Sequence, residues 1–172
     1  MRIVVAELPR GGRQIPVDAT VDWIVEAASE ALEAVPSRLD GVLDFSFPAR
    51  AMRVDVRCRI QAEADRGCDR CGESAGVVVG CDELLLYFRA GAAEEVSAEV
   101  ELDAEDLEVG WYEDGVIDAA SVLREALTLA MPSRVLCENA EDCERRTVEL
   151  LARAHEGQPV GHPAFAVLGE LK

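Results

Sequence analysis

Two long strand-like segments, residues 52–64 and 74–88, constrain the fold of this chain more than any other feature of its sequence. In the first segment apolar and polar residues alternate, which is typical of an antiparallel strand with one face in the core and the other in water. The second segment is rich in Val and Leu. Because only the short stretch CDRCGE (68–73) lies between them, the segments predict a long β-hairpin with Cys68 and Cys71 at its tip.

The rest of the pattern indicates an α+β fold with a mainly antiparallel sheet. Residues 39–47 alternate like a further strand, and residues 21–34 and 117–131 have apolar residues at helical spacing. A proline follows each helical stretch and ends it. We expect a single domain over residues 1–172, in which one long helix near 117–131 covers the sheet and another lies near 21–34. We also expect a short helical piece around TVELLARA, residues 147–154.

The charge of the chain is unevenly distributed. Its formal net charge is −17, and residues 90–123 contain 11 acidic and no basic side chains. Eight of those acids lie in residues 94–108, which predict an acidic loop. Such a charge disfavours broad nucleic-acid binding, which depends on Lys and Arg, although the remainder of the chain could carry a local basic face. We find no signal peptide and no apolar run long enough for a membrane span, so we expect a cytoplasmic protein.

Four of the six cysteines form two closely spaced pairs. Cys68 and Cys71 are separated by two residues, a spacing that lets two thiolates share a tetrahedral metal ion, and Cys137 and Cys143 are the natural second pair. The five residues between Cys137 and Cys143 exceed the usual two to four. The C-x-x-C spacing of the first pair nevertheless predicts a two-knuckle structural zinc site built from these four cysteines.

Two other interpretations of the cysteines stay open at this level. The 68–71 pair could be the dithiol of a small cytosolic thiol oxidoreductase, although such a pair usually precedes a helix and here valines follow. The cysteines could also be incidental to an interaction module. Cys58 and Cys81 fit the apolar strand pattern and are expected in the core.

Three arginines of the first hairpin strand, Arg53, Arg57 and Arg59, share its polar face. Arginine on a sheet face can both fork onto phosphate and stack on bases, so this face is a candidate RNA-binding surface. The interleaved Asp55 supports the alternative of an ordinary solvated face. No phosphate-binding glycine loop or nucleophile motif is present in the sequence, and we expect a protein that is not an enzyme.

These residues, in this order, resemble the YceD family, the large ribosomal RNA subunit accumulation proteins. The resemblance rests on the CDRCGE knuckle after an alternating strand, the helix ending LREALTLAMP, the following cysteine pair and the terminal PAFAVLGELK, and it covers residues 40–172. Many members have a further glycine-rich C-x-x-C turn, where this chain has ERRTVELLARA.

The resemblance implies a non-enzymatic factor in the synthesis, processing or stability of 23S rRNA, and hence in assembly of the large ribosomal subunit. The implied partner is 23S rRNA or its precursor, contacted directly or through a basic large-subunit ribosomal protein. The acidic segment suits the second route, because an acidic surface attracts cationic proteins. No small-molecule substrate and no membrane are implied.

Overall fold

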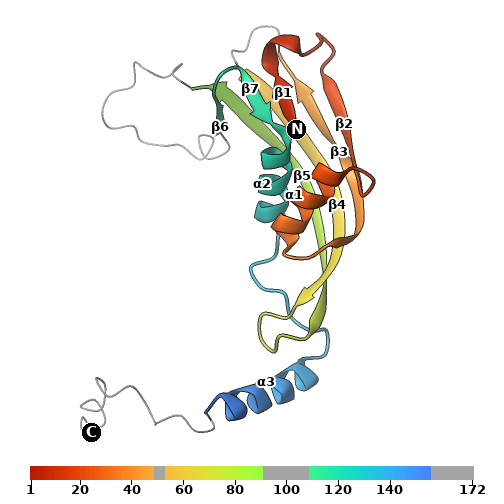
Figure 1. Cartoon of the computed structure of the whole chain (residues 1–172), viewed down its shortest axis with the longest axis vertical. Helices are drawn as coiled ribbons and strands as arrows, with labels where there is room; N and C mark the ends of the chain where they lie inside the picture. Colours follow the sequence, from red (N-terminus) through yellow and green to blue (C-terminus); the bar gives the residue numbers. More distant parts are fainter. Residues whose placement is uncertain (49–52, 91–108, 156–172) are drawn as a thin grey trace, which may run out of the picture.

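The computed structural model describes residues 1–48, 53–90 and 109–155. The predicted acidic loop 94–108 and the terminal PAFAVLGELK lie outside these residues. The described chain forms a mixed α+β structure with a five-stranded sheet in the order β2-β3-β4-β5-β6 and a separate two-stranded sheet, β1-β7 (Figure 1). All pairings are antiparallel except β5 with β6, which is parallel. The strands are β1 (Arg2–Val4), β2 (Arg13–Asp18), β3 (Pro36–Ser46), β4 (Arg53–Gly67), β5 (Ser74–Arg89), β6 (Val109–Tyr112) and β7 (Val116–Asp118), and a 3-10 turn, η1 (Val5–Glu7), follows β1.

The predicted hairpin is confirmed as strands β4 and β5, which pair in register from Arg53 opposite Phe88 to Gly67 opposite Ser74. The alternating residues of β4 place one set of small apolar side chains against the core, where they are at most 3% exposed. This set consists of Val54, Val56, Cys58, Ile60, Ala62 and Ala64. Cys58 and Cys81 are both buried, as expected of core cysteines.

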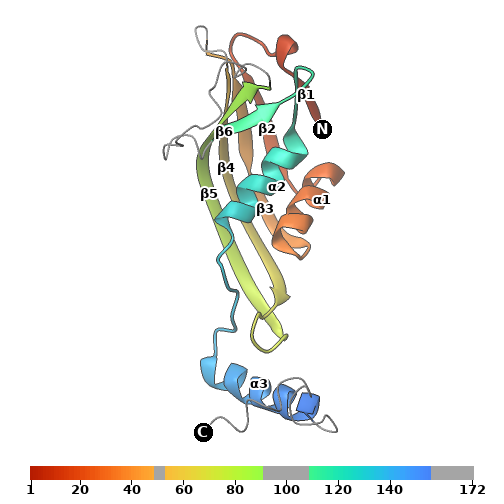
Figure 2. The same ribbon diagram turned by 90° about the vertical axis from the view of Figure 1, so that its left-hand side faces the viewer.

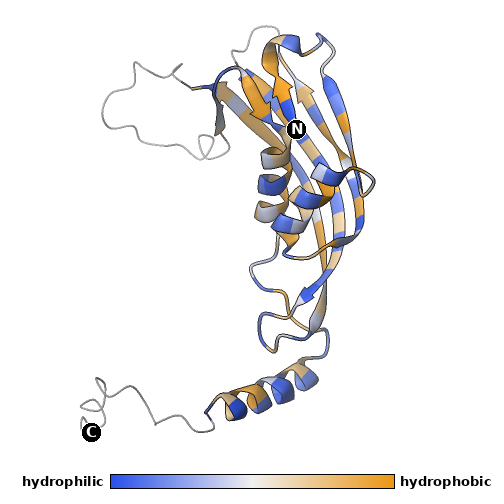
Figure 3. Ribbon diagram, in the orientation of Figure 1, coloured by the Kyte–Doolittle hydropathy of each residue, from blue (hydrophilic) through white to orange (hydrophobic). Residues whose placement is uncertain are grey.

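Two short helices, rather than one long one, cover the sheet. Helix α1 (Asp22–Leu32) has 11 residues and α2 (Ala119–Ala130) has 12, and they lie beside each other on the same face (Figure 2). Both positions follow the sequence prediction, but a single dominant covering helix is not found. Asp118 caps α2 by accepting a hydrogen bond from the backbone N–H of Ala120 at 3.3 Å. The apolar faces of both helices meet the inner face of the sheet and complete the core (Figure 3).

The longest of the described helices, α3 (Ala140–His155), does not cover the sheet. It lies beyond the tip of the β4–β5 hairpin, at the opposite end of the molecule from β1 and β7 (Figure 1). Cys143 is its single buried residue, and Val148, Leu150 and Leu151 are about half exposed. We expected only a short helical piece around residues 147–154, so both the length and the early start of α3 correct the prediction. No helix within the described residues is long and apolar enough to cross a membrane.

Candidate metal centre

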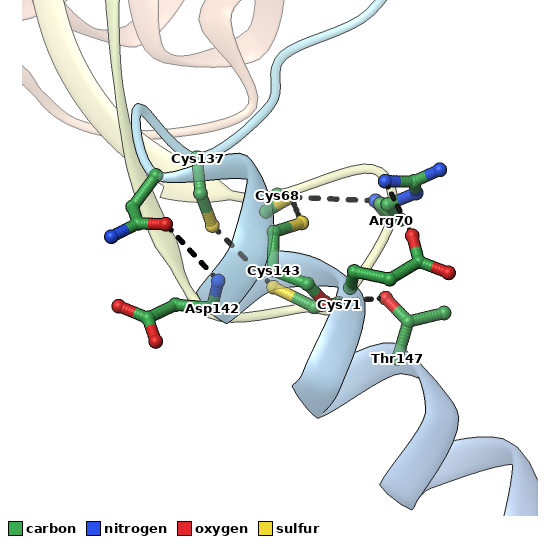
Figure 4. Close-up of polar contacts among 9 residues, drawn as sticks. Cys68, Arg70, Cys71, Cys137, Asp142, Cys143 and Thr147 are labelled. Carbon is green, nitrogen blue, oxygen red and sulfur yellow. Dashed lines mark hydrogen bonds and ion pairs between the residues drawn. The ribbon is translucent and has the colours of Figure 1, made fainter.

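Four cysteine sulfurs from two distant parts of the chain gather at the hairpin tip (Figure 4). The Sγ atoms of Cys68, Cys71, Cys137 and Cys143 all lie within 4.8 Å of one another. The Sγ atoms of Cys68 and Cys143 are 3.7 Å apart, and those of Cys71 and Cys137 are 3.4 Å apart. In a tetrahedral zinc–thiolate site, Zn–S bonds of about 2.3 Å place the sulfurs about 3.8 Å from one another. The cluster therefore has nearly the dimensions of a four-thiolate metal site.

The first cysteine pair is positioned by a tight turn between β4 and β5. The backbone N–H of Gly72 donates to the carbonyl of Cys68 at 2.9 Å, and the N–H of Cys68 donates to the carbonyl of Glu73 at 2.7 Å. Gly72 has a φ of 76°, in the left-handed region that glycine adopts at little cost. The N–H of Arg70 points at the Cys68 sulfur, 3.4 Å away. This turn directs both sulfurs to one side of the hairpin tip.

The second pair is positioned by the start of α3. Asn139 caps this helix, since its side-chain oxygen accepts from the N–H of Asp142 at 3.1 Å and its carbonyl accepts from the N–H of Cys143 at 3.1 Å. Cys143 thus lies in the first helical turn, while Cys137 lies in the segment before it. The unusually wide spacing of this pair is explained by the capping turn that stands between the two cysteines.

Asp69, inside the first knuckle, joins the hairpin tip to the segment after α2. Its backbone N–H donates to the carbonyl of Val135 at 2.8 Å, and its carboxylate accepts from the N–H of Val135 at 2.6 Å. Arg66 holds the other carboxylate oxygen at 2.9 Å. Sequence reasoning missed this contact, because its only signal was an acid between two cysteines and its partner is 66 residues away.

The four thiols are unequal as acids. Hydrogen bonds from backbone N–H groups, first that of Cys71 and then that of Arg70, lower the pKa of the Cys68 thiol to about 6 against the opposing effect of burial. By contrast, hydrogen bonding to Cys71, together with burial, raises the pKa of Cys137 to about 12. Burial also raises the pKa of Cys143. One thiolate forms readily, whereas four together require a bound cation to offset their repulsion, so the donor set fits a soft divalent metal ion.

The contacts within the cluster also bear on the oxidoreductase alternative. Each sulfur of the first pair has a near contact in the second pair, 68 with 143 and 71 with 137. Cys68 and Cys71 precede strand β5 and not a helix N-terminus, which is where redox C-x-x-C pairs acquire their reactivity. This arrangement favours a shared cation over a 68–71 disulfide.

The three candidate RNA-binding arginines lie on the face of β4 opposite its buried core residues, as their alternation with those residues predicted. Two of them form ion pairs: Arg53 with Asp55 at 2.8 Å, and Arg57 with Asp82 at 2.6 Å. Arg59 lies opposite Asp82 in the register of β4 and β5. Because carboxylates stand beside all three, this face is less cationic than its arginines alone suggested.

One comparison with known proteins gives a result. A family model described as "Large ribosomal RNA subunit accumulation protein YceD" matches residues 56–172, about two thirds of the chain. The matched region contains both cysteine pairs, α2 and α3. No curated protein and no solved structure matches the chain.

Proposed function

This chain belongs to the YceD family, and from that membership we infer a non-enzymatic factor that supports synthesis, processing or stability of 23S rRNA during assembly of the large ribosomal subunit. Membership of this family supports a role of the protein in accumulation of the large-subunit ribosomal RNA. A ribosome-related role also points to the cytoplasm as the place where the protein acts and to macromolecules, not small molecules, as its partners.

The observation that carries the structural side of this proposal is the cluster of four cysteine sulfurs. Cys68, Cys71, Cys137 and Cys143 would hold one structural zinc ion, which would draw four thiolates together and close the loop between the two knuckles. Since Cys143 is the one buried residue of α3, the position of this helix depends on the cluster far more than on apolar packing. The site would therefore act as a clasp that fixes α3 at the hairpin tip.

Of the two routes to the ribosome, contact through a basic ribosomal protein receives more support than direct contact with RNA. The candidate RNA face carries Arg53, Arg57 and Arg59 but has a neighbouring carboxylate for each of them. Phosphate binding would have to compete with those carboxylates. A strongly acidic chain attracts cationic proteins and repels RNA.

The cellular role is tested by removing the gene and measuring mature 23S rRNA and its precursors relative to 16S rRNA. We expect less 23S rRNA, restored by the wild-type gene but restored poorly by Cys137→Ser/Cys143→Ser. Unchanged 23S rRNA levels after removal would refute the proposed role.

The metal clasp is tested separately by elemental analysis of protein purified without chelator. We expect about one zinc per chain, lost in the Cys137→Ser/Cys143→Ser variant and retained in Cys81→Ala, which removes a thiol outside the cluster. Metal-free protein with a disulfide between Cys68 and Cys71 that forms and breaks readily would favour the oxidoreductase alternative instead.

A further inference from the structure

A groove with an apolar floor and acidic rims lies between α2 and the helix-side face of strands β5 and β6. Two adjoining cavities of about 200 and 340 Å³ form it, and they share Tyr87, Gly110 and Glu125. Residues 109–113 line it without interruption. At about 3.3 Å per residue, this length of strand spans about 13 Å, enough for about four residues of an extended peptide.

The floor of the groove is built from Tyr87 and the backbone of Gly110. Tyr87 is 8% exposed, and its hydroxyl donates to Glu125 Oε2 on α2 at 3.3 Å. A Cβ at position 110 would lie only 2.5 Å from the Tyr87 ring, so glycine is what allows the ring to lie against β6. Leu129 of α2, which is 71% exposed, adds an apolar wall.

The rims carry three acids, Glu83, Glu113 and Glu125, and no Lys or Arg stands among the described lining residues. Asp118 also lines the groove, but it forms an ion pair with the α-amino group of Met1. Within the described residues, no arginine forms an ion pair with Glu83, Glu113 or Glu125. Among the same residues, the cysteines form the one cluster that could hold a metal ion, so these carboxylates do not converge on a single cation.

An apolar floor between separated acids matches the side chains of lysine and arginine. Both have an aliphatic stem that packs on apolar surface and a charged head that reaches a carboxylate. The stem would lie on Tyr87 and Leu129, with the head at Glu113, Glu125 or Glu83. Three such acids along an extended groove suit a segment with several cationic side chains.

We propose that this groove binds an extended, lysine- and arginine-rich peptide segment of a partner protein. The proposal deepens the proposed function, on which it rests for the expectation that the partner is a basic ribosomal protein. The chemistry of the groove, however, is independent of that function. A peptide assay on the purified chain can therefore fail while the 23S rRNA phenotype stands, and the reverse is equally possible.

The probe is a fluorescein-labelled decapeptide of alternating lysine and serine, titrated with the full chain at low salt and followed by anisotropy. We expect Glu113→Gln/Glu125→Gln to weaken binding by roughly 3- to 30-fold, as for the loss of two exposed charge pairs. The matched control is Glu26→Gln/Glu149→Gln, which removes the same charge from exposed positions on α1 and α3. It should change the affinity less than about twofold.

A second variant, Gly110→Ala, keeps every charge but places a Cβ 2.5 Å from the Tyr87 ring, so the ring that forms the floor of the groove must move. It should weaken peptide binding while circular dichroism shows that the fold is retained. Equal weakening by the groove and control double variants would show that bulk charge alone binds the peptide and would overturn the proposal. Unchanged peptide binding by Glu113→Gln/Glu125→Gln would also overturn the proposal. The same holds if a labelled ten-nucleotide polyuridine, and not the peptide, binds this groove.

Discussion

The Asp69 contact gives the sharpest test of how the two knuckles are held together, because it can be removed without touching a sulfur. In Asp69→Ala, the N–H of Val135 loses its carboxylate acceptor at 2.6 Å. A hydrogen bond to a charged group contributes about 1.5–3 kcal/mol. Arg66 loses its ion pair with Asp69 but keeps Glu33 at 2.8 Å, so the lost ion pair adds little to the free-energy cost of the substitution.

That free energy should appear in the affinity for zinc. The intact contact holds the hairpin tip against the segment after α2 before any metal binds, whereas in Asp69→Ala part of the binding free energy must bring them together. A loss of about 1.5–3 kcal/mol corresponds to a roughly 10- to 150-fold higher Kd. The assay is a competition titration with a chromophoric zinc chelator at neutral pH.

Two further variants control this experiment. Asp69→Asn keeps an acceptor oxygen without the charge and should lie between wild type and Asp69→Ala. Asp65→Ala removes an exposed carboxylate of the neighbouring strand β4 and should bind zinc like the wild type. A wild-type Kd for Asp69→Ala would refute the reasoning, since it would mean that the two knuckles meet without this contact.

Three more predictions concern the rest of the fold. Removing the metal with a chelator should release α3 but not the sheet, so amide hydrogen exchange should become faster in residues 144–155 and stay slow in β4. An equal change of the exchange rate in α3 and β4 would contradict the clasp. Gly41→Ala should lower the free energy of unfolding by more than about 2 kcal/mol in a urea titration, because the added Cβ would meet the backbone of Arg59 and lie 2.8 Å from Ile60 Cα. A loss below about 1 kcal/mol would contradict this prediction, since it would mean that β3 and β4 move apart easily. Burial of Asp118 opposes ionisation of its carboxyl group, but hydrogen bonds from the Met1 α-amino group, Ser121 and Ala120 outweigh burial and lower the pKa of that carboxyl. The ionised carboxylate therefore stabilises the fold fully above the ordinary pKa of 3.8, and this stabilisation is lost as the pH falls through the lowered pKa. The stability difference between wild type and Asp118→Asn should accordingly be present at pH 7 and shrink below pH 3.8, and a difference that is independent of pH would refute this assignment.

Much of the fold could be predicted because its signals are local. The two-residue alternation from Val54 to Ala62 defines a half-buried strand whatever the strand pairs with, and the helical spacing of α2 is equally independent of context. The pairing of the two cysteine knuckles was predicted from residue type and spacing together with the family resemblance, because five intervening residues exceed the usual spacing of a second knuckle.

The features that were missed depend on packing between distant segments. Helix α3 buries only Cys143, and its first half, AEDCERR, is mostly charged, so the sequence pattern indicated only the more apolar second half. The ion pair between Arg57 and Asp82 depends on the register of the hairpin, which no short pattern specifies. Strands β1 and β7 have three residues each and pair across more than a hundred positions of the chain.

The attachment of α3 through one buried side chain has a consequence for sequence divergence. Once Cys143 and the turn before it are retained, the core does not require the identity of residues 144–155, because none of them is buried. Glu144 forms an ion pair with Arg70 of the hairpin tip at 2.8 Å, but both side chains are about half exposed, so this pair contributes little. The segment 144–155 can therefore be exchanged for another structure without repacking the core. A chain with a different helix or turn after Cys143 should therefore keep this scaffold and differ only in what it presents at this end.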